Sequence, residues 1–110
     1  MAFSEEYIDV RGKRIQMLVG GEGEPLLYLH SAGGEVAWLP FFELLSKKYK
    51  VYVPGHPGFA KSDGLQEIDS MEDLAFHYTD LMDQVGLQQP FLVGLSLGGW
   101  LAAELATRYS

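Results

Sequence analysis

One stretch of this chain decides its fold: Pro90-Phe91-Leu92-Val93-Gly94-Leu95-Ser96-Leu97-Gly98-Gly99-Trp100. It consists of a short apolar run, the pattern G-x-S-x-G, and the start of a second apolar segment. This order is typical of a nucleophile elbow, a sharp turn between a strand and a helix that exposes a serine hydroxyl. Glycines two residues either side of the serine have no Cβ to obstruct such a turn. Ser96 is therefore the candidate nucleophile.

The sequence on both sides of the motif agrees with that interpretation. Residues 90–95 are uncharged and almost wholly apolar, as in a strand buried within a parallel sheet. Residues 97–109 are apolar nearly all round, which predicts a helix packed inside a domain. The turn between them predicts a sparsely allowed backbone conformation at its central residue. The plainer alternative is that the glycines only let a buried helix approach a sheet and that the serine caps this helix.

Working outward, the chain alternates strand and helix patterns. The expected strands are residues 5–10, 13–19, 26–30, 51–53 and 90–95, and the expected helices are residues 38–47, 71–85 and 97–109. The second helix has the clearest signals, because Ser70 and Asp73 resemble a capping box and Gly86 follows the last apolar position. Two strands followed by three strand–helix units predict an α/β fold, a predominantly parallel sheet with helices on both faces.

The composition is that of an ordinary globular domain. The 110 residues are 47% hydrophobic and 21% charged, enough for one small domain. A net charge of −7 argues against nucleic acid and anionic membranes as partners, since both need a basic face. With no cysteine and no histidine pair at metal-ligand spacing, we expect no metal, and no motif indicates a cofactor. Without a signal peptide or a run of ~20 apolar residues, we expect a soluble, cytoplasmic protein.

Three glycine-containing segments follow the expected parallel strands in turn. They are Leu29-His30-Ser31-Ala32-Gly33-Gly34, Pro54-Gly55-His56-Pro57-Gly58-Phe59-Ala60-Lys61-Ser62 and Gly94-Leu95-Ser96-Leu97-Gly98-Gly99. In this order and spacing the chain resembles the N-terminal half of an α/β-hydrolase-fold protein. The resemblance covers nearly the whole chain. It implies a single core domain over residues 1–110 that holds strands 1–5 of the fold and is incomplete.

The resemblance implies roles for four residues. Ser96 matches the nucleophile, and the backbone N–H of Leu97 matches one donor of the oxyanion hole. The second donor is implied in the loop after the third strand, at Ala32, with Gly33 behind it. Backbone donors suit this task because they are fixed before negative charge develops on the intermediate. This chain has Ser31 where the family usually has glycine.

A serine at the elbow implies acyl chemistry rather than the epoxide or halide chemistry of family members with an aspartate there. The implied substrate is a small molecule with an ester, lactone, thioester or activated carbon–carbon bond, attacked to form an acyl-enzyme at Ser96. The motif resembles esterases, enol-lactonases and cofactor-free haloperoxidases about equally. The alternative is a non-catalytic module that binds a small ligand in the same pocket without a catalytic base.

The histidines of this chain do not complete a catalytic triad. In the family, the acid and then the histidine follow the nucleophile, and no histidine follows Ser96 here. We expect His77 to be solvated among the aspartates of its helix and His30 to be structural. The resemblance places His56 near the rim of the site.

The expected sheet order leaves residues 90–95 as an open, uncharged edge strand, a template for association. We therefore expect these residues to be the first part of a longer hydrolase. The expected partners are the small-molecule substrate and either a missing C-terminal half or further copies of this chain.

Overall fold

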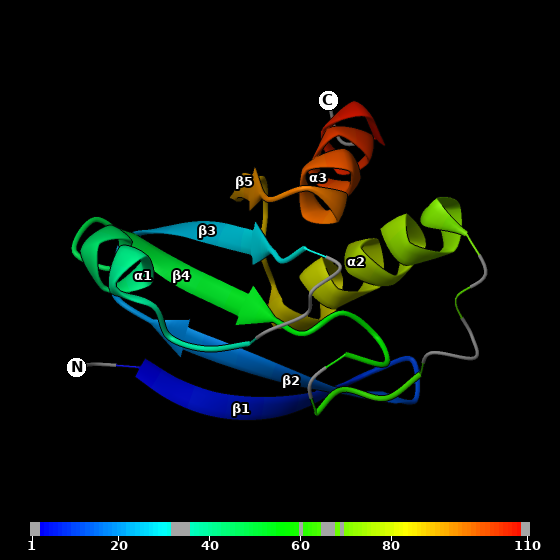
Figure 1. The fold of residues 1–110 in the computed structure, drawn as a ribbon, viewed down its shortest axis with the longest axis horizontal. Helices are drawn as coiled ribbons and strands as arrows, with labels where there is room; N and C mark the ends of the chain where they lie inside the picture. Colours follow the sequence, from blue (N-terminus) through cyan, green and yellow to red (C-terminus); the bar gives the residue numbers. More distant parts are fainter. Residues whose placement is uncertain (1–2, 32–35, 60, 65–67, 69, 109–110) are drawn as a thin grey trace.

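The computed structural model describes residues 3–31, 36–59, 61–64, 68 and 70–108. The elements in chain order are β1 (Phe3–Val10), β2 (Lys13–Gly20), β3 (Glu24–Leu29), α1 (Pro40–Leu45), β4 (Tyr49–Pro54), α2 (Met71–Val85), β5 (Phe91–Gly94) and α3 (Leu97–Arg108) (Figure 1). Every strand and helix expected from the sequence is present, with shifts of a few residues at some ends. The candidate oxyanion residues Ala32 and Gly33 lie outside the described residues.

The strands form one five-stranded sheet in the order β1-β2-β4-β3-β5. β2 pairs antiparallel with β1 and with β4, while β3 pairs in parallel with β4 and β5. The sheet is therefore mixed, with β2 opposed to the other four strands. The parallel part is the part in which strands alternate with helices, as the sequence predicts. Figure 1 shows that β3 and β4 end on the same side of the sheet.

The hairpin of β1 and β2 closes through a two-residue turn. Arg11 and Gly12 both have positive φ, 53° and 85°. A type I′ turn requires positive φ at both central positions, and its twist matches that of the two strands. The Asp9 carboxylate accepts the Gly12 N–H at 2.7 Å and stabilises the turn further.

The sheet is covered on both faces, because successive side chains of a strand point to opposite sides. Leu27 and Leu29 of β3 pack in the core under α2 and α3. Leu26, which directly precedes Leu27, packs instead with Phe42 of α1 on the other face. The predicted arrangement of helices on both faces is confirmed.

Among the described residues, no helix has both the length and the hydropathy needed to cross a bilayer.

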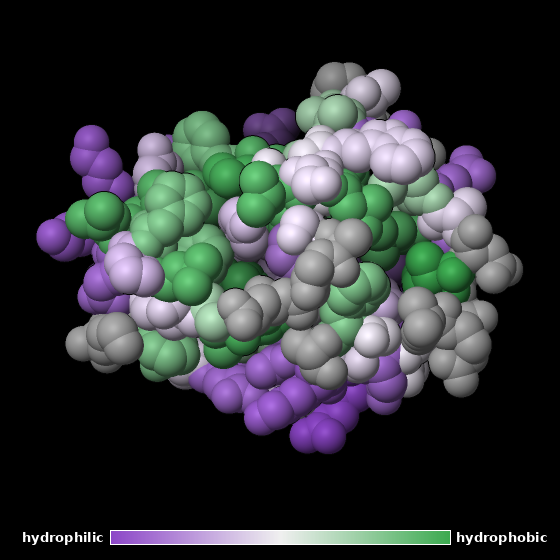
Figure 2. Space-filling model, in the orientation of Figure 1, coloured by the Kyte–Doolittle hydropathy of each residue, from purple (hydrophilic) through white to green (hydrophobic). Residues whose placement is uncertain are grey.

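The helix after the elbow is only half buried, which corrects the expectation from its apolar sequence. Leu101 and Leu105 are fully buried, whereas Trp100 is 59% exposed. β5 lies at the edge of the described sheet, and its Phe91 is 52% exposed. Figure 2 shows further hydrophobic side chains at the surface over α1, where Phe41 and Leu44 are exposed.

Candidate active site

Ser96 follows Leu95 in the two-residue connection between the end of β5 and the start of α3. Its φ is +58°, in the left-handed region, and the residue is exposed. A non-glycine residue in this region carries strain of about 1–3 kcal/mol and persists only where its surroundings enforce it. The strained turn predicted from G-x-S-x-G is therefore present, and it presents the serine at the surface.

The two flanking positions must be glycine because other parts of the backbone lie where a Cβ would be. A Cβ at Gly94 would meet the backbone carbonyl of Gly98, and a Cβ at Gly98 would meet the carbonyl of Leu29. The Leu95 N–H donates to the same Leu29 carbonyl at 3.2 Å. The elbow is thus held directly against the end of β3, where the candidate oxyanion loop begins.

Leu97 is the first residue of α3. The N–H groups of a helix's first turn have no intrahelical acceptor, and they lie at the positive end of the helix dipole. The Leu97 N–H therefore suits an incoming anion beside Ser96.

Two buried histidines join the loops after β3 and β4. His30 is 2% exposed and His56 is 1% exposed, and their ring centroids are 3.7 Å apart. The His56 backbone N–H donates to His30 Nε2 at 2.8 Å, so the ring proton of His30 is on Nδ1. That Nδ1–H donates to the Ser31 carbonyl at 2.6 Å. His30 is structural, as expected, but His56 is buried rather than at the rim of the site.

The ring of His56 is itself fixed at both nitrogens. Nε2–H donates to the His30 carbonyl at 2.8 Å, and the Tyr78 hydroxyl donates to Nδ1 at 2.6 Å. Burial, followed by the neighbouring His30, lowers the pKa of His56 to about 4. Burial lowers the pKa of His30 and raises that of Tyr78. All three groups are therefore uncharged at neutral pH.

His77 is buried, and the expectation of a solvated residue is wrong. It is 2% exposed, with its ring edge-on to Tyr78 at 4.9 Å. Burial, followed by the charge of Lys13 and by His56, lowers its pKa to about 3. In the described part of the chain neither ring nitrogen has a hydrogen-bond partner. Helical spacing could have predicted this burial, since position 77 is three residues after buried Leu74 and four before buried Leu81.

None of these histidines serves Ser96 as a base. Ser96 is exposed, whereas His30 and His56 are buried with both ring nitrogens engaged, and His77 is sealed in the core. Within the described residues, no group of three or more histidine, aspartate or glutamate side chains is placed to hold a metal ion. The elbow therefore carries the candidate nucleophile and a candidate backbone donor, while none of the three histidines in the described part of the chain is placed to accept the serine proton.

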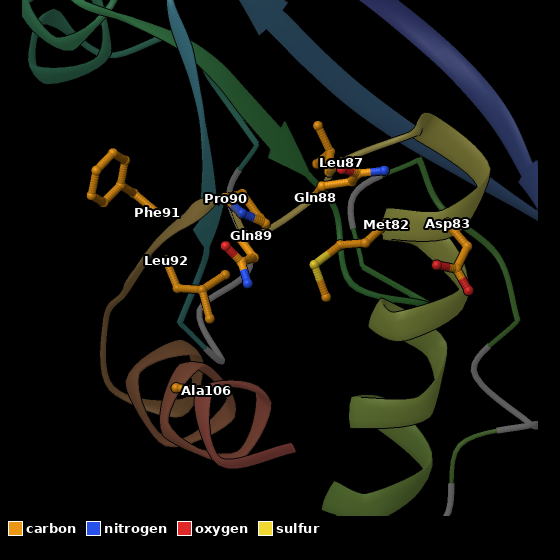
Figure 3. Close-up of a pocket in the computed structure, with 9 residues that line it drawn as sticks. All are labelled: Met82, Asp83, Leu87, Gln88, Gln89, Pro90, Phe91, Leu92 and Ala106. Carbon is orange, nitrogen blue, oxygen red and sulfur yellow. The ribbon is translucent and has the colours of Figure 1, made fainter. Parts of the chain in front are cut away.

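A groove of about 980 Å³ lies away from Ser96, at the opposite end of β5. Figure 3 shows its lining, which comes from the end of α2, the connection to β5, β5 itself and α3. The residues are Met82, Asp83, Leu87, Gln88, Gln89, Pro90, Phe91, Leu92 and Ala106. The groove runs beside the unpaired edge of the sheet and contains none of the candidate site residues.

Several curated proteins are similar to this chain in sequence. The chain is 31% identical over 107 residues to the dihydrolipoyllysine-residue acetyltransferase component of the acetoin cleaving system of Cupriavidus necator, covering 96% of this chain and 29% of that protein. It is 33% identical over 103 residues to 2-hydroxy-6-oxo-6-phenylhexa-2,4-dienoate hydrolase of Burkholderia cepacia, covering 87% and 36%. The chain thus spans about a third of the length of the curated relatives it matches.

Solved structures are also similar to this chain in fold. A membrane phospholipase A, described as a bacterial virulence factor, superposes with a TM-score of 0.91 at 29% identity, covering 98% of this chain and 36% of that one. The family model for the alpha/beta hydrolase fold matches residues 24–110, which include the loop after β3, the loop after β4 and the elbow. This chain therefore belongs to the alpha/beta hydrolase fold family.

Proposed function

We propose that this chain is the nucleophile-bearing part of a serine hydrolase that acts on a small-molecule carbonyl substrate through an acyl-enzyme at Ser96. The observation that carries the proposal is the exposed Ser96 at φ +58° between β5 and α3. A fold that tolerates this strain commonly uses the residue that bears it. Composition alone, acidic and without cysteine, leads us to place the protein in the cytoplasm.

In the proposed reaction, Ser96 Oγ attacks the substrate carbonyl while a base accepts its proton. The carbonyl oxygen becomes an oxyanion and accepts the Leu97 N–H and the Ala32 N–H, with Gly33 behind. The intermediate collapses and the leaving group departs with a proton, which leaves an acyl group on Ser96. Water then attacks the acyl group and releases the acid. Because the local histidines are sealed, we assign the base and its acid partner to a further segment of a longer protein.

Among the substrate classes open to such a serine, the relatives favour an activated carbon–carbon bond. Several are named as hydrolases of 2-hydroxy-6-oxo dienoates, dienedioates or trienedioates, at 32–34% identity. In such compounds a ketone carbonyl lies close to the bond to be broken, so serine attack yields the same acyl-enzyme that an ester would. Esters, lactones and thioesters are the remaining classes in the proposal.

A second candidate is a non-catalytic module that binds a small ligand. The observation that favours it is that all three histidines are buried, so the elbow has no base among the described residues. A serine without a base is a weak nucleophile.

Covalent labelling separates the two candidates. We expect a fluorophosphonate probe to label stoichiometrically the longer protein that carries the proposed base, and Ser96→Ala in that protein to abolish the labelling. Ser4→Ala is the matched control, because it removes an exposed hydroxyl of β1 that donates to the Glu6 carboxylate at 3.2 Å. Absence of labelling in the unaltered protein favours the binding module. Labelling that survives Ser96→Ala contradicts the proposed nucleophile.

A further inference from the structure

The Tyr78 hydroxyl connects α2 to two loops that meet beside the elbow. Tyr78 is fully buried, and its hydroxyl lies 2.6 Å from His56 Nδ1 in the loop after β4. The ring of His56 in turn contacts His30 at the end of β3. None of these three groups has a part in the acyl transfer proposed above.

Each hydrogen bond of this cluster has a fixed direction. A carbonyl only accepts, so His56 must donate through Nε2–H to the His30 carbonyl. A neutral imidazole carries one ring proton, so His56 Nδ1 is an acceptor, and the Tyr78 phenol is its donor. With the proton on Nδ1 instead, Nε2 and the His30 carbonyl would face each other as two acceptors. Tyr78 and the carbonyl therefore select the same tautomer.

His30 is oriented by the backbone N–H of His56, not by the His56 ring. Its Nε2 accepts the His56 backbone N–H at 2.8 Å, which leaves the proton on Nδ1 and directs it to the Ser31 carbonyl. Because a peptide group is planar, a carbonyl held at Ser31 restrains the whole peptide group that leads into the loop after β3. On the other side, the Leu29 carbonyl accepts the Leu95 N–H from the elbow. The cluster thus lies between the elbow and the start of that loop.

We propose that Tyr78 is a positioning residue: its hydroxyl fixes the ring of His56, and the backbone N–H of His56 orients His30, which holds the Ser31 carbonyl at the start of the oxyanion loop. That this loop binds an oxyanion rests on the proposed function. The restraint of the Ser31 peptide by the Tyr78 hydroxyl does not rest on it.

The test is Tyr78→Phe, which removes the hydroxyl and keeps the ring that packs edge-on against His56 and His77. Tyr52→Phe is the matched control, since it removes a phenol from the same core cluster. The readouts are the ring nitrogen signals of the histidines and the carbonyl carbon signal of Ser31 by NMR at pH 7.5, with the rate of fluorophosphonate labelling measured beside them.

In the unaltered protein we expect the ring proton on Nε2 of His56 and on Nδ1 of His30. Tyr78→Phe is expected to shift the ring nitrogen signals of His56 and His30 and the carbonyl signal of Ser31. We also expect labelling to slow about tenfold, because a barrier raised by the free energy of one hydrogen bond lowers a rate by about that factor. Tyr52→Phe leaves all of these as they were. If neither the unaltered protein nor Tyr78→Phe is labelled, but Tyr78→Phe shifts the NMR signals, the positioning role is supported and the proposed function fails.

Two results overturn the proposal. One is the opposite tautomer at either histidine in the unaltered protein, a measurement that does not depend on whether a variant folds. The other is a Tyr78→Phe protein whose Ser31 signal does not differ from that of Tyr52→Phe.

Discussion

At the residue scale, the account depends on Ser96 and the two glycines around it. The position of the turn could be predicted from the sequence because its cause is local, as only glycine fits where backbone meets backbone. Helix periodicity agrees with the burial of His77, whereas the aspartates of its helix favour the solvated position that the sequence predicts. The roles of Ala32 and Gly33 still rest on resemblance.

Substitution of Gly98 tests this close approach. A Cβ at Gly98 would meet the Leu29 carbonyl, whereas a Cβ at Gly99 would have only ordinary contact with the backbone of Gly94 at 3.5 Å. We expect Gly98→Ala to lower the free energy of unfolding by about 1–3 kcal/mol or more, as overpacking does. Gly99→Ala is the control and is expected to be neutral or slightly stabilising, because alanine favours helix. Urea denaturation measures both, and equal effects would contradict the packing described.

At the element scale, helix ends were predictable where their chemistry is local. α2 spans Met71–Val85, as expected, because Ser70 caps its first turn and Gly86 ends it at φ 82°. α1 begins at Pro40 rather than at residue 38. A residue before proline is disfavoured in helical conformation, and Leu39 is indeed extended with ψ 158°. Pro40 therefore sets the start of α1.

The cap of α2 offers a test at this scale. The Ser70 hydroxyl accepts the Asp73 N–H at 3.1 Å. Ser70→Ala removes this acceptor, and we expect the free energy of unfolding to fall by about 1 kcal/mol. Ser70→Asp should largely restore it, because aspartate is an equally good cap and bears a charge that suits a helix N-terminus. A Ser70→Ala protein as stable as the unaltered one would show that the cap contributes nothing.

At the scale of the whole molecule, the fold class and the layering followed from the alternation of strands and helices. The exposure of Trp100 could not be predicted in this way. An apolar helix sequence indicates that each face of the helix can be buried, but it does not indicate which elements lie against those faces. The same holds for β5, whose uncharged residues indicate a sheet interior while the described sheet ends there.

The buried histidines predict acid sensitivity of the whole fold. The pKa of His56 lies at about 4 and that of His77 at about 3 in the folded protein, below the ordinary 6.5. The unfolded chain therefore binds these protons at higher pH than the folded one, and stability falls as pH drops from about 6.5 towards 3. At about 1.4 kcal/mol per pKa unit, His56 alone accounts for roughly 3 kcal/mol at the acid limit.

Urea denaturation between pH 7.5 and 4 measures this loss, and His77→Leu isolates one part of it. The variant removes a buried group with no hydrogen-bond partner in the described structure. The unaltered protein loses stability as pH falls because His77 binds a proton more readily in the unfolded chain, and the variant does not share this loss. We therefore expect the free energy of unfolding of His77→Leu, relative to that of the unaltered protein, to increase as pH falls through this range. An advantage that does not change with pH would mean that His77 is not held neutral by burial.

The most direct test of the central claim is a crystal structure of the longer protein that carries the proposed base, after reaction with a fluorophosphonate. We expect the phosphorus to be bonded to Ser96 Oγ, with φ of Ser96 still positive and a phosphonyl oxygen about 2.8 Å from the Leu97 nitrogen, the distance of an oxyanion-hole hydrogen bond. An adduct on another residue, or a phosphonyl oxygen directed away from the start of α3, would contradict the account.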